Sequence, residues 1–161
     1  MSMSIPALHV SDASEVKGRG DVFIASRVSA PVSGVFSLEL SAKFAPPVDD
    51  YPSGGFTLKV DLNDGLRATF TPTSIELMNS FGRTNPTVFL TGRCKAEHAA
   101  GAEPAKGLRY WLMVADNGVA KDDKATPDVV GFAIHDNTGA RIAYGTGPVK
   151  KPGDFKVKPK P

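Results

Sequence analysis

Apolar and polar residues alternate with a period of two along most of this chain, a pattern typical of β-strands with one buried face. The longest example is 36–44, where five apolar side chains share one face and four polar side chains the other. The alternation over 56–62 resumes over 66–70 after Asn63-Asp64-Gly65, a sequence that favours a tight turn. We therefore predict a long early strand followed by a β-hairpin.

The same pattern, with less regularity, predicts further strands on both sides of these. In 74–79 we expect Ile75 and Leu77 to share a face, whereas 108–115 is apolar on both faces and is therefore expected to be central or covered on both sides. Asp136-Asn137-Thr138-Gly139 predicts a second hairpin. The alanine-rich segment 94–106 is interrupted by glycine and proline, which favours a strand end followed by a loop. The further predicted strands are 7–10, 20–28, 74–79, 87–96, 108–115, 129–135, 140–146 and 154–158.

About nine to eleven strands and no heptad or βαβ rhythm predict an all-β fold, either an antiparallel β-sandwich or a closed β-barrel. Strand pairing is non-local, so the sequence leaves this choice open. The 161 residues suit one domain, and the 16 glycines and 13 prolines are spread along the chain as turn residues. We predict a lead-in over 1–19, a single β-domain over 20–158 and a basic, proline-containing tail over 159–161.

The formal net charge of +2 is unevenly placed, because residues 149–161 carry five lysines against one aspartate. The rest of the chain is mildly acidic, which argues against a nucleic-acid-binding face. Cys94 is the only cysteine, so an intrachain disulfide is excluded. The chain contains no apolar stretch long enough for a membrane span. Residues 1–6 lack the basic and apolar segments of a signal peptide, so we expect a cytoplasmic location unless a signal has been removed.

Four aspartates fall in one connection between predicted strands and form the candidate metal site. Calcium favours several oxygen ligands gathered by a loop, but the spacing here matches no calcium motif. Asp116-Asn117-Gly118 is also explained as a turn. We therefore expect no cofactor, and calcium is the ion that this connection would suit. The candidate ligands are Asp116, Asp122, Asp123 and Asp128.

Aromatic and basic residues near predicted strand ends are the candidate ligand contacts. Phe81 and Arg83 lie in a polar loop, where binding residues are common, although Phe81 would also serve to close the end of the core. Tyr110 and Trp111 lie on the doubly apolar strand. His135 ends the strand before the second hairpin.

The order of turns and strands in the second half resembles that of post-COAP type β-domains. The resemblance rests on Asp116-Asn117-Gly118, an acidic loop, the strand 131–134, the turn 136–140 and the closing segment 153–157. Such domains belong to bacterial surface and secreted multidomain proteins. The resemblance implies a β-sandwich-like module and supplies no catalytic residues.

The sequence favours a non-catalytic β-domain that binds a partner protein, a glycan or a small ligand through loops at one sheet end. The alternative is a small β-barrel enzyme of the isomerase, cyclase or decarboxylase type with an apolar interior cavity. That enzyme would use interior polar groups such as Glu76, Arg109, Tyr110 or His135. A third hypothesis is a structural subunit that pairs its sheet edges with copies of itself. The sequence does not decide whether the chain is an enzyme.

Overall fold

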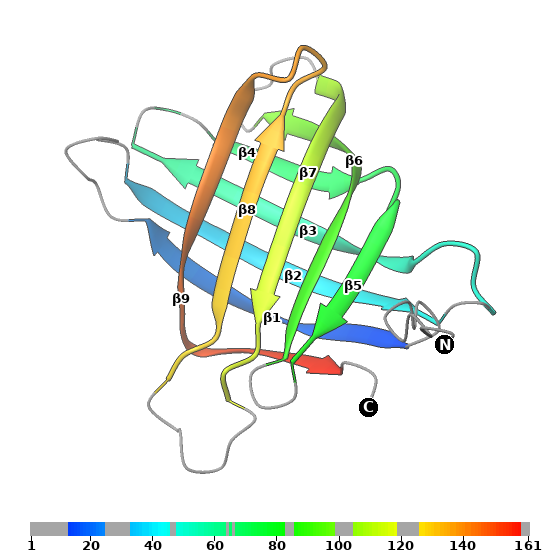
Figure 1. Ribbon diagram of the computed structural model, residues 1–161. Helices are drawn as coiled ribbons and strands as arrows, with labels where there is room; N and C mark the ends of the chain where they lie inside the picture. The colour runs from blue at the N-terminus through cyan, green and yellow to red at the C-terminus, as the bar shows by residue number, and fades with distance from the viewer. Residues whose placement is uncertain are drawn as a thin grey trace, which may run out of the picture.

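The described residues of the computed structural model form a closed antiparallel β-barrel without a helix (Figure 1). They are residues 13–24, 33–45, 48–63, 65, 67–82, 86–98, 105–118 and 126–158. Their nine strands are β1 (Ser14–Ile24), β2 (Gly34–Phe44), β3 (Ser53–Leu62), β4 (Arg67–Pro72), β5 (Leu77–Phe81), β6 (Thr87–His98), β7 (Ala105–Ala115), β8 (Val129–His135) and β9 (Arg141–Lys158).

Every strand pairs antiparallel with its neighbours, in the order β4-β3-β2-β1-β9-β8-β7-β6-β5. Pairing of β4 with β6 closes the ring, so β5 is a short addition that continues along β6 where β4 ends. The all-β prediction is confirmed, and of the two architectures left open the chain adopts the closed barrel. In Figure 1, β5 to β9 form the front wall, and β1 to β4 cross behind it.

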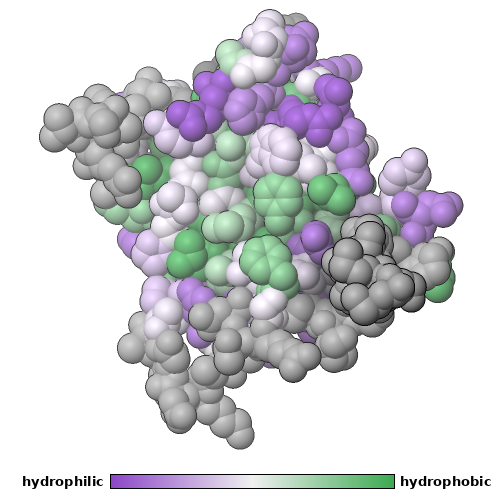
Figure 2. Space-filling model, viewed as in Figure 1, coloured by the Kyte–Doolittle hydropathy of each residue, from purple (hydrophilic) through white to green (hydrophobic). Residues whose placement is uncertain are grey.

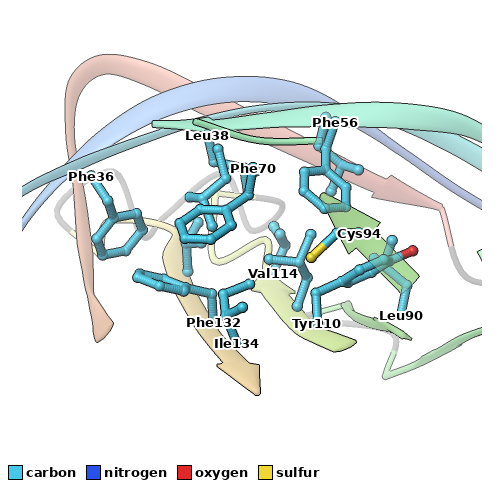
Figure 3. Packing of buried hydrophobic residues seen from close by; sticks show 14 of the residues in the cluster. Phe36, Leu38, Phe56, Phe70, Leu90, Cys94, Tyr110, Val114, Phe132 and Ile134 are labelled. Atoms are coloured by element: carbon cyan, nitrogen blue, oxygen red, sulfur yellow. The ribbon is translucent and has the colours of Figure 1, made fainter. Parts of the chain in front are cut away.

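The barrel interior is occupied by apolar side chains from the inward face of each strand (Figure 3). Phe36 meets Phe132 edge to face at 4.7 Å between ring centres, and Phe56 meets Tyr110 in the same way at 4.7 Å. These pairs join the front wall to the back wall through the core. The alternation along each sequence segment is therefore the alternation between the inside and the outside of the barrel.

The two predicted hairpins are confirmed as β3–β4 and β8–β9. The strands predicted over 140–146 and 154–158 are parts of one strand, β9, which descends beside β8 and then turns to pair with β1 (Figure 1). The β1–β9 register shifts between Arg19 and Asp21, as expected where a strand bends through a bulge.

Two further expectations from the sequence differ from the structure. β1 begins at Ser14, ahead of the predicted boundary at residue 20. Ile75 is buried whereas Leu77 is exposed, because 74–76 precedes β5 instead of belonging to it. The strand β7 is central, which is one of the two arrangements predicted for 108–115, and no other layer of the described residues covers its outer apolar face. The strand predicted over 7–10 lies outside the described residues.

Candidate binding surface

The outer face of the front wall carries a group of apolar side chains that no other part of the described chain covers. The register places Trp111 between Thr91 and Ala133, with Tyr144 beyond Ala133. Trp111 is 39% exposed and Tyr144 is 46% exposed. Figure 2 shows apolar side chains gathered over the middle of this face. We call this surface the aromatic face and define it as Leu77, Phe81, Phe89, Trp111, Met113 and Tyr144.

The aromatic face is built across four strands of one sheet, so its backbone positions are fixed by ladder hydrogen bonds. Phe89 on β6 pairs with Met113 on β7, and the Phe89 and Trp111 rings lie 5.4 Å apart, centre to centre. Leu77 and Phe81 extend the face onto β5, and Phe81 is 60% exposed. Exposed apolar groups gathered in this way mark interaction sites on soluble domains more often than isolated exposed residues do.

A row of basic side chains borders the aromatic face on one side. Arg93, Arg109, His135 and Arg141 are successive cross-strand neighbours from β6 to β9. Hydrophilic side chains line the upper margin of the front wall in Figure 2. We call Arg93, Arg109 and Arg141 the arginine row. Along β7, Arg109 lies two residues before Trp111, and along β9, Arg141 lies three residues before Tyr144. Along β6, Arg93 lies two residues after the cross-strand partner of Trp111.

The three arginines differ in their local partners. Arg109 donates to Glu76 at 2.7 Å, so its charge is largely matched. The Arg141 guanidinium lies over the Tyr144 ring, 3.9 Å from the ring centre. Within the described residues neither Arg93 nor Arg141 forms an ion pair. The row therefore presents unmatched positive charge directly beside the aromatic face.

At the opposite end of the barrel, two buried aspartates bind the backbone of β9. Asp116 follows β7 and accepts the Val157 N–H at 3.1 Å, while Asp128 precedes β8 and accepts the Phe155 N–H at 2.8 Å. Their other oxygens accept the N–H groups of Gly118 and Asn117. Carboxylates held in this way satisfy buried donors that no strand reaches.

Burial is the main reason that both carboxyl groups hold a proton more tightly than usual. It raises the pKa of Asp128 to about 6, against the opposing effect of the Phe155 and Asn117 N–H groups, and the neighbouring Asp116 charge raises it further. Burial also raises the pKa of Asp116. Asp128 is therefore sensitive to pH in the mildly acidic range.

The candidate metal ligands are only partly brought together. Carboxylate oxygens of Asp116, Asp128 and Asp154 lie within 4.8 Å of one another, and the sequence did not single out Asp154, because it lies far along the chain. Asp122 and Asp123 lie outside the described residues. Since all four oxygens of Asp116 and Asp128 already accept N–H groups, their arrangement is explained without an ion. Calcium binding therefore stays a prediction.

A shallow depression of about 600 Å³ lies on the outer wall over β3, β2, β1 and the last part of β9. Its charges alternate across strands: Glu39 pairs in register with Arg19, which pairs with Asp154 on its other side. In the next row Asp21 is the partner of Lys150. Opposite charges on neighbouring strands stabilise a sheet by themselves. The depression therefore has a structural explanation.

The sequence-predicted ligand contacts do not form one site. Trp111 and Phe81 lie on the aromatic face, while Tyr110 is fully buried in the core and donates to the Ser74 carbonyl at 2.9 Å. His135 is half-buried between Arg109 and Arg141, and its Nδ1 has no hydrogen-bond partner among the described residues. Arg83 lies outside the described residues.

The residues proposed for an interior enzyme site are also dispersed. Tyr110 points into the core, whereas Arg109 and Glu76 form an ion pair on the outer surface. His135 lies beside Arg109 on the outer face. These four side chains therefore do not surround one interior space.

Sequence reasoning missed most of the aromatic face and the arginine row. It singled out neither Phe89, Met113 and Tyr144 nor Arg93 and Arg141. The available signal was the second apolar face of 108–115, which was interpreted as the mark of a strand that is central or covered on both sides. Adding the neighbouring residues required the register between β6, β7, β8 and β9, which only the fold supplies.

A comparison of the chain with protein-family models, with curated proteins and with solved structures finds no match. The resemblance to post-COAP type domains therefore stays a prediction. Among the described residues, no helix has the length and apolar character needed to cross a membrane.

Proposed function

We propose that this chain is a non-catalytic binding module that docks a partner protein on the aromatic face. The observation that carries the proposal is the contiguous exposure of Trp111, Tyr144, Met113 and their neighbours on the outside of a barrel whose interior is occupied. Trp, Tyr, Met and Arg are enriched at the centres of protein interfaces. The sheet holds these side chains in place before binding, which reduces the entropy lost on association.

A protein ligand suits this surface better than a glycan. Sugars bind aromatic rings by stacking on an open face, but the Arg141 guanidinium covers the Tyr144 ring. The Trp111 ring packs beside Phe89 with 37° between the ring planes. The surface is broad and extends from β5 to β9, as expected for a polypeptide partner. The proposed contact surface is therefore the outer wall of the barrel, whereas the sequence favoured loops at one sheet end.

The proposal is tested by selecting random 12-residue peptides, displayed on phage, against the whole chain. The selected peptides are then synthesised, and their binding to purified variants is measured by calorimetry. We expect Trp111→Ser and Tyr144→Ser to raise Kd about tenfold or more, because each removes a buried aromatic contact worth about 1.4 kcal/mol or more. The control is Thr57→Ala on the opposite outer wall, which should leave Kd unchanged.

Circular dichroism and urea unfolding establish that each variant is folded. If the selection yields no binding peptides, or if binding is the same in Trp111→Ser and Tyr144→Ser as in the unaltered chain, the aromatic face is not the binding surface.

A further inference from the structure

The geometry of the front wall also points to the chemical class of the partner, an inference that rests on the proposed function. We infer that the aromatic face binds an acidic polypeptide segment in which carboxylate side chains lie beside apolar ones. The apolar side chains of the segment pack on Trp111, Met113 and Phe89, while its carboxylates reach the arginine row. The inference depends on how charge and apolar surface adjoin on the front wall.

The first step is that the charge of the arginine row is available to a partner. Arg93 and Arg141 are exposed, and among the described residues neither has a carboxylate partner. Two acidic groups in adjacent segments already accept hydrogen bonds. Glu76 accepts from Arg109, and Asp136 accepts from Thr138 and Ala140 within its turn.

The second step is that the arginines and the aromatic rings form one continuous surface. Arg141 touches Tyr144 directly, and Arg109 is two residues before Trp111 on the same strand. A guanidinium that rests on an aromatic ring keeps its N–H groups at the ring edge, where they can donate to a carboxylate. An anionic group bound there would place its neighbouring side chains over the rings.

The third step is that the charge pattern disfavours a second copy of the chain. A two-fold contact of the front wall with itself would set the arginine row either against the same row of the copy, where like charges repel, or against the opposite end of its sheet. The described carboxylates that flank β7 and β8 at that end, Asp116 and Asp128, are buried and already accept backbone N–H groups. Among the described residues, these two groups are therefore poorly placed to complement the arginines of a copy, which favours acidic groups from a different protein.

The test uses the Trp111-dependent peptides obtained by phage selection. We expect this pool to be enriched in Asp and Glu relative to the unselected library. For the tightest peptide, replacing both arginines (Arg93→Gln with Arg141→Gln) should raise Kd about tenfold or more. The matched control is Arg67→Gln, an exposed arginine on β4 that pairs with Asp61 and should leave Kd unchanged.

Salt supplies a second readout that a purely structural change would not produce. Raising NaCl from about 50 to 500 mM should weaken peptide binding to the unaltered chain several-fold, because it screens exposed charges. It should have little effect on the double arginine variant. A pool that depends on Trp111 but lacks acidic enrichment and salt dependence would overturn the inference and leave the proposed function standing.

Two other results would also overturn it. One is a dimer in sedimentation that dissociates in Trp111→Ser, since the face would then belong to a second copy. The other is binding to phosphatidylserine-containing vesicles that requires Trp111 and the arginines while acidic peptides fail to compete.

Discussion

Asp116 and Asp128 take the place of a neighbouring strand along one edge of β9. β8 begins at Val129, so beyond that point the β9 edge opposite β1 has no strand partner among the described residues. The two carboxylates accept the Phe155 and Val157 N–H groups there. The same burial that makes these bonds strong raises the pKa of both groups, so this end of the barrel responds to pH.

Stability should fall as pH rises from about 4 to 7. Asp128 has a folded pKa of about 6 against an ordinary value of 3.8, so the folded state binds more protons between these values. The stability that protonation of Asp128 contributes is complete below pH 3.8 and is lost as pH rises through 6. We expect a loss on the order of 1–3 kcal/mol in the free energy of unfolding, measured in urea.

The matched variant for this pH dependence is Asp128→Asn, whose amide resembles the protonated acid and does not titrate. It should flatten the slope of stability against pH, even though the loss of one acceptor lowers stability at acid pH. An equal slope in the variant and the unaltered chain would show that Asp128 is not the titrating group.

At the scale of elements, the link between β4 and β5 decides how the ring closes. Residues 73–76 cross the edge of β6, where the Thr73 and Ser74 N–H groups donate to the Arg93 carbonyl and Glu76 N–H donates to the Thr91 carbonyl. Tyr110 donates to the Ser74 carbonyl from the core. β6 can therefore pair with β4 over one half and with β5 over the other, because this short link is held against its edge.

Gly92→Ala should destabilise the barrel by about 2 kcal/mol or more, a value typical of a buried backbone clash. An added Cβ would overlap the Ser74 carbonyl oxygen and lie 2.9 Å from the Tyr110 hydroxyl, so the link would have to move. The control is Gly55→Ala, where the nearest atom is 3.9 Å away on Pro72 and the change should stay within about 0.5 kcal/mol. Urea unfolding measures both, and equal stability would refute the role of the link.

At the scale of the whole molecule, stability comes from a core shared by both walls, while the outer face of the front wall is left open. Phe132 from β8 packs against Phe36 from β2 across the barrel. Phe81 at the end of β5 is exposed on the aromatic face. Apolar residues therefore serve two purposes in this chain, and their position in the barrel separates them.

Phe132→Ala should lower the free energy of unfolding by about 3–5 kcal/mol, because it removes the ring and leaves a cavity between the walls. Phe81→Ala should change it by less than about 0.5 kcal/mol, since the ring is 60% exposed. Thermal or urea unfolding of the two variants tests whether Phe132 belongs to the core and Phe81 to the open outer face. A large loss in Phe81→Ala would mean that the aromatic face is part of the core.

The sequence by itself determined most of the strands, the two hairpins and the all-β class, because alternation and turn chemistry are local properties. It also placed Trp111 on a doubly apolar strand. The tertiary structure alone decided that the sheet closes as a barrel through β4 and β6 and that β9 is continuous. It likewise brought Asp154 to Asp116 and set Arg141 in one row with His135 and Arg109. Each of these depends on register between segments far apart in the chain, and no local pattern encodes that register.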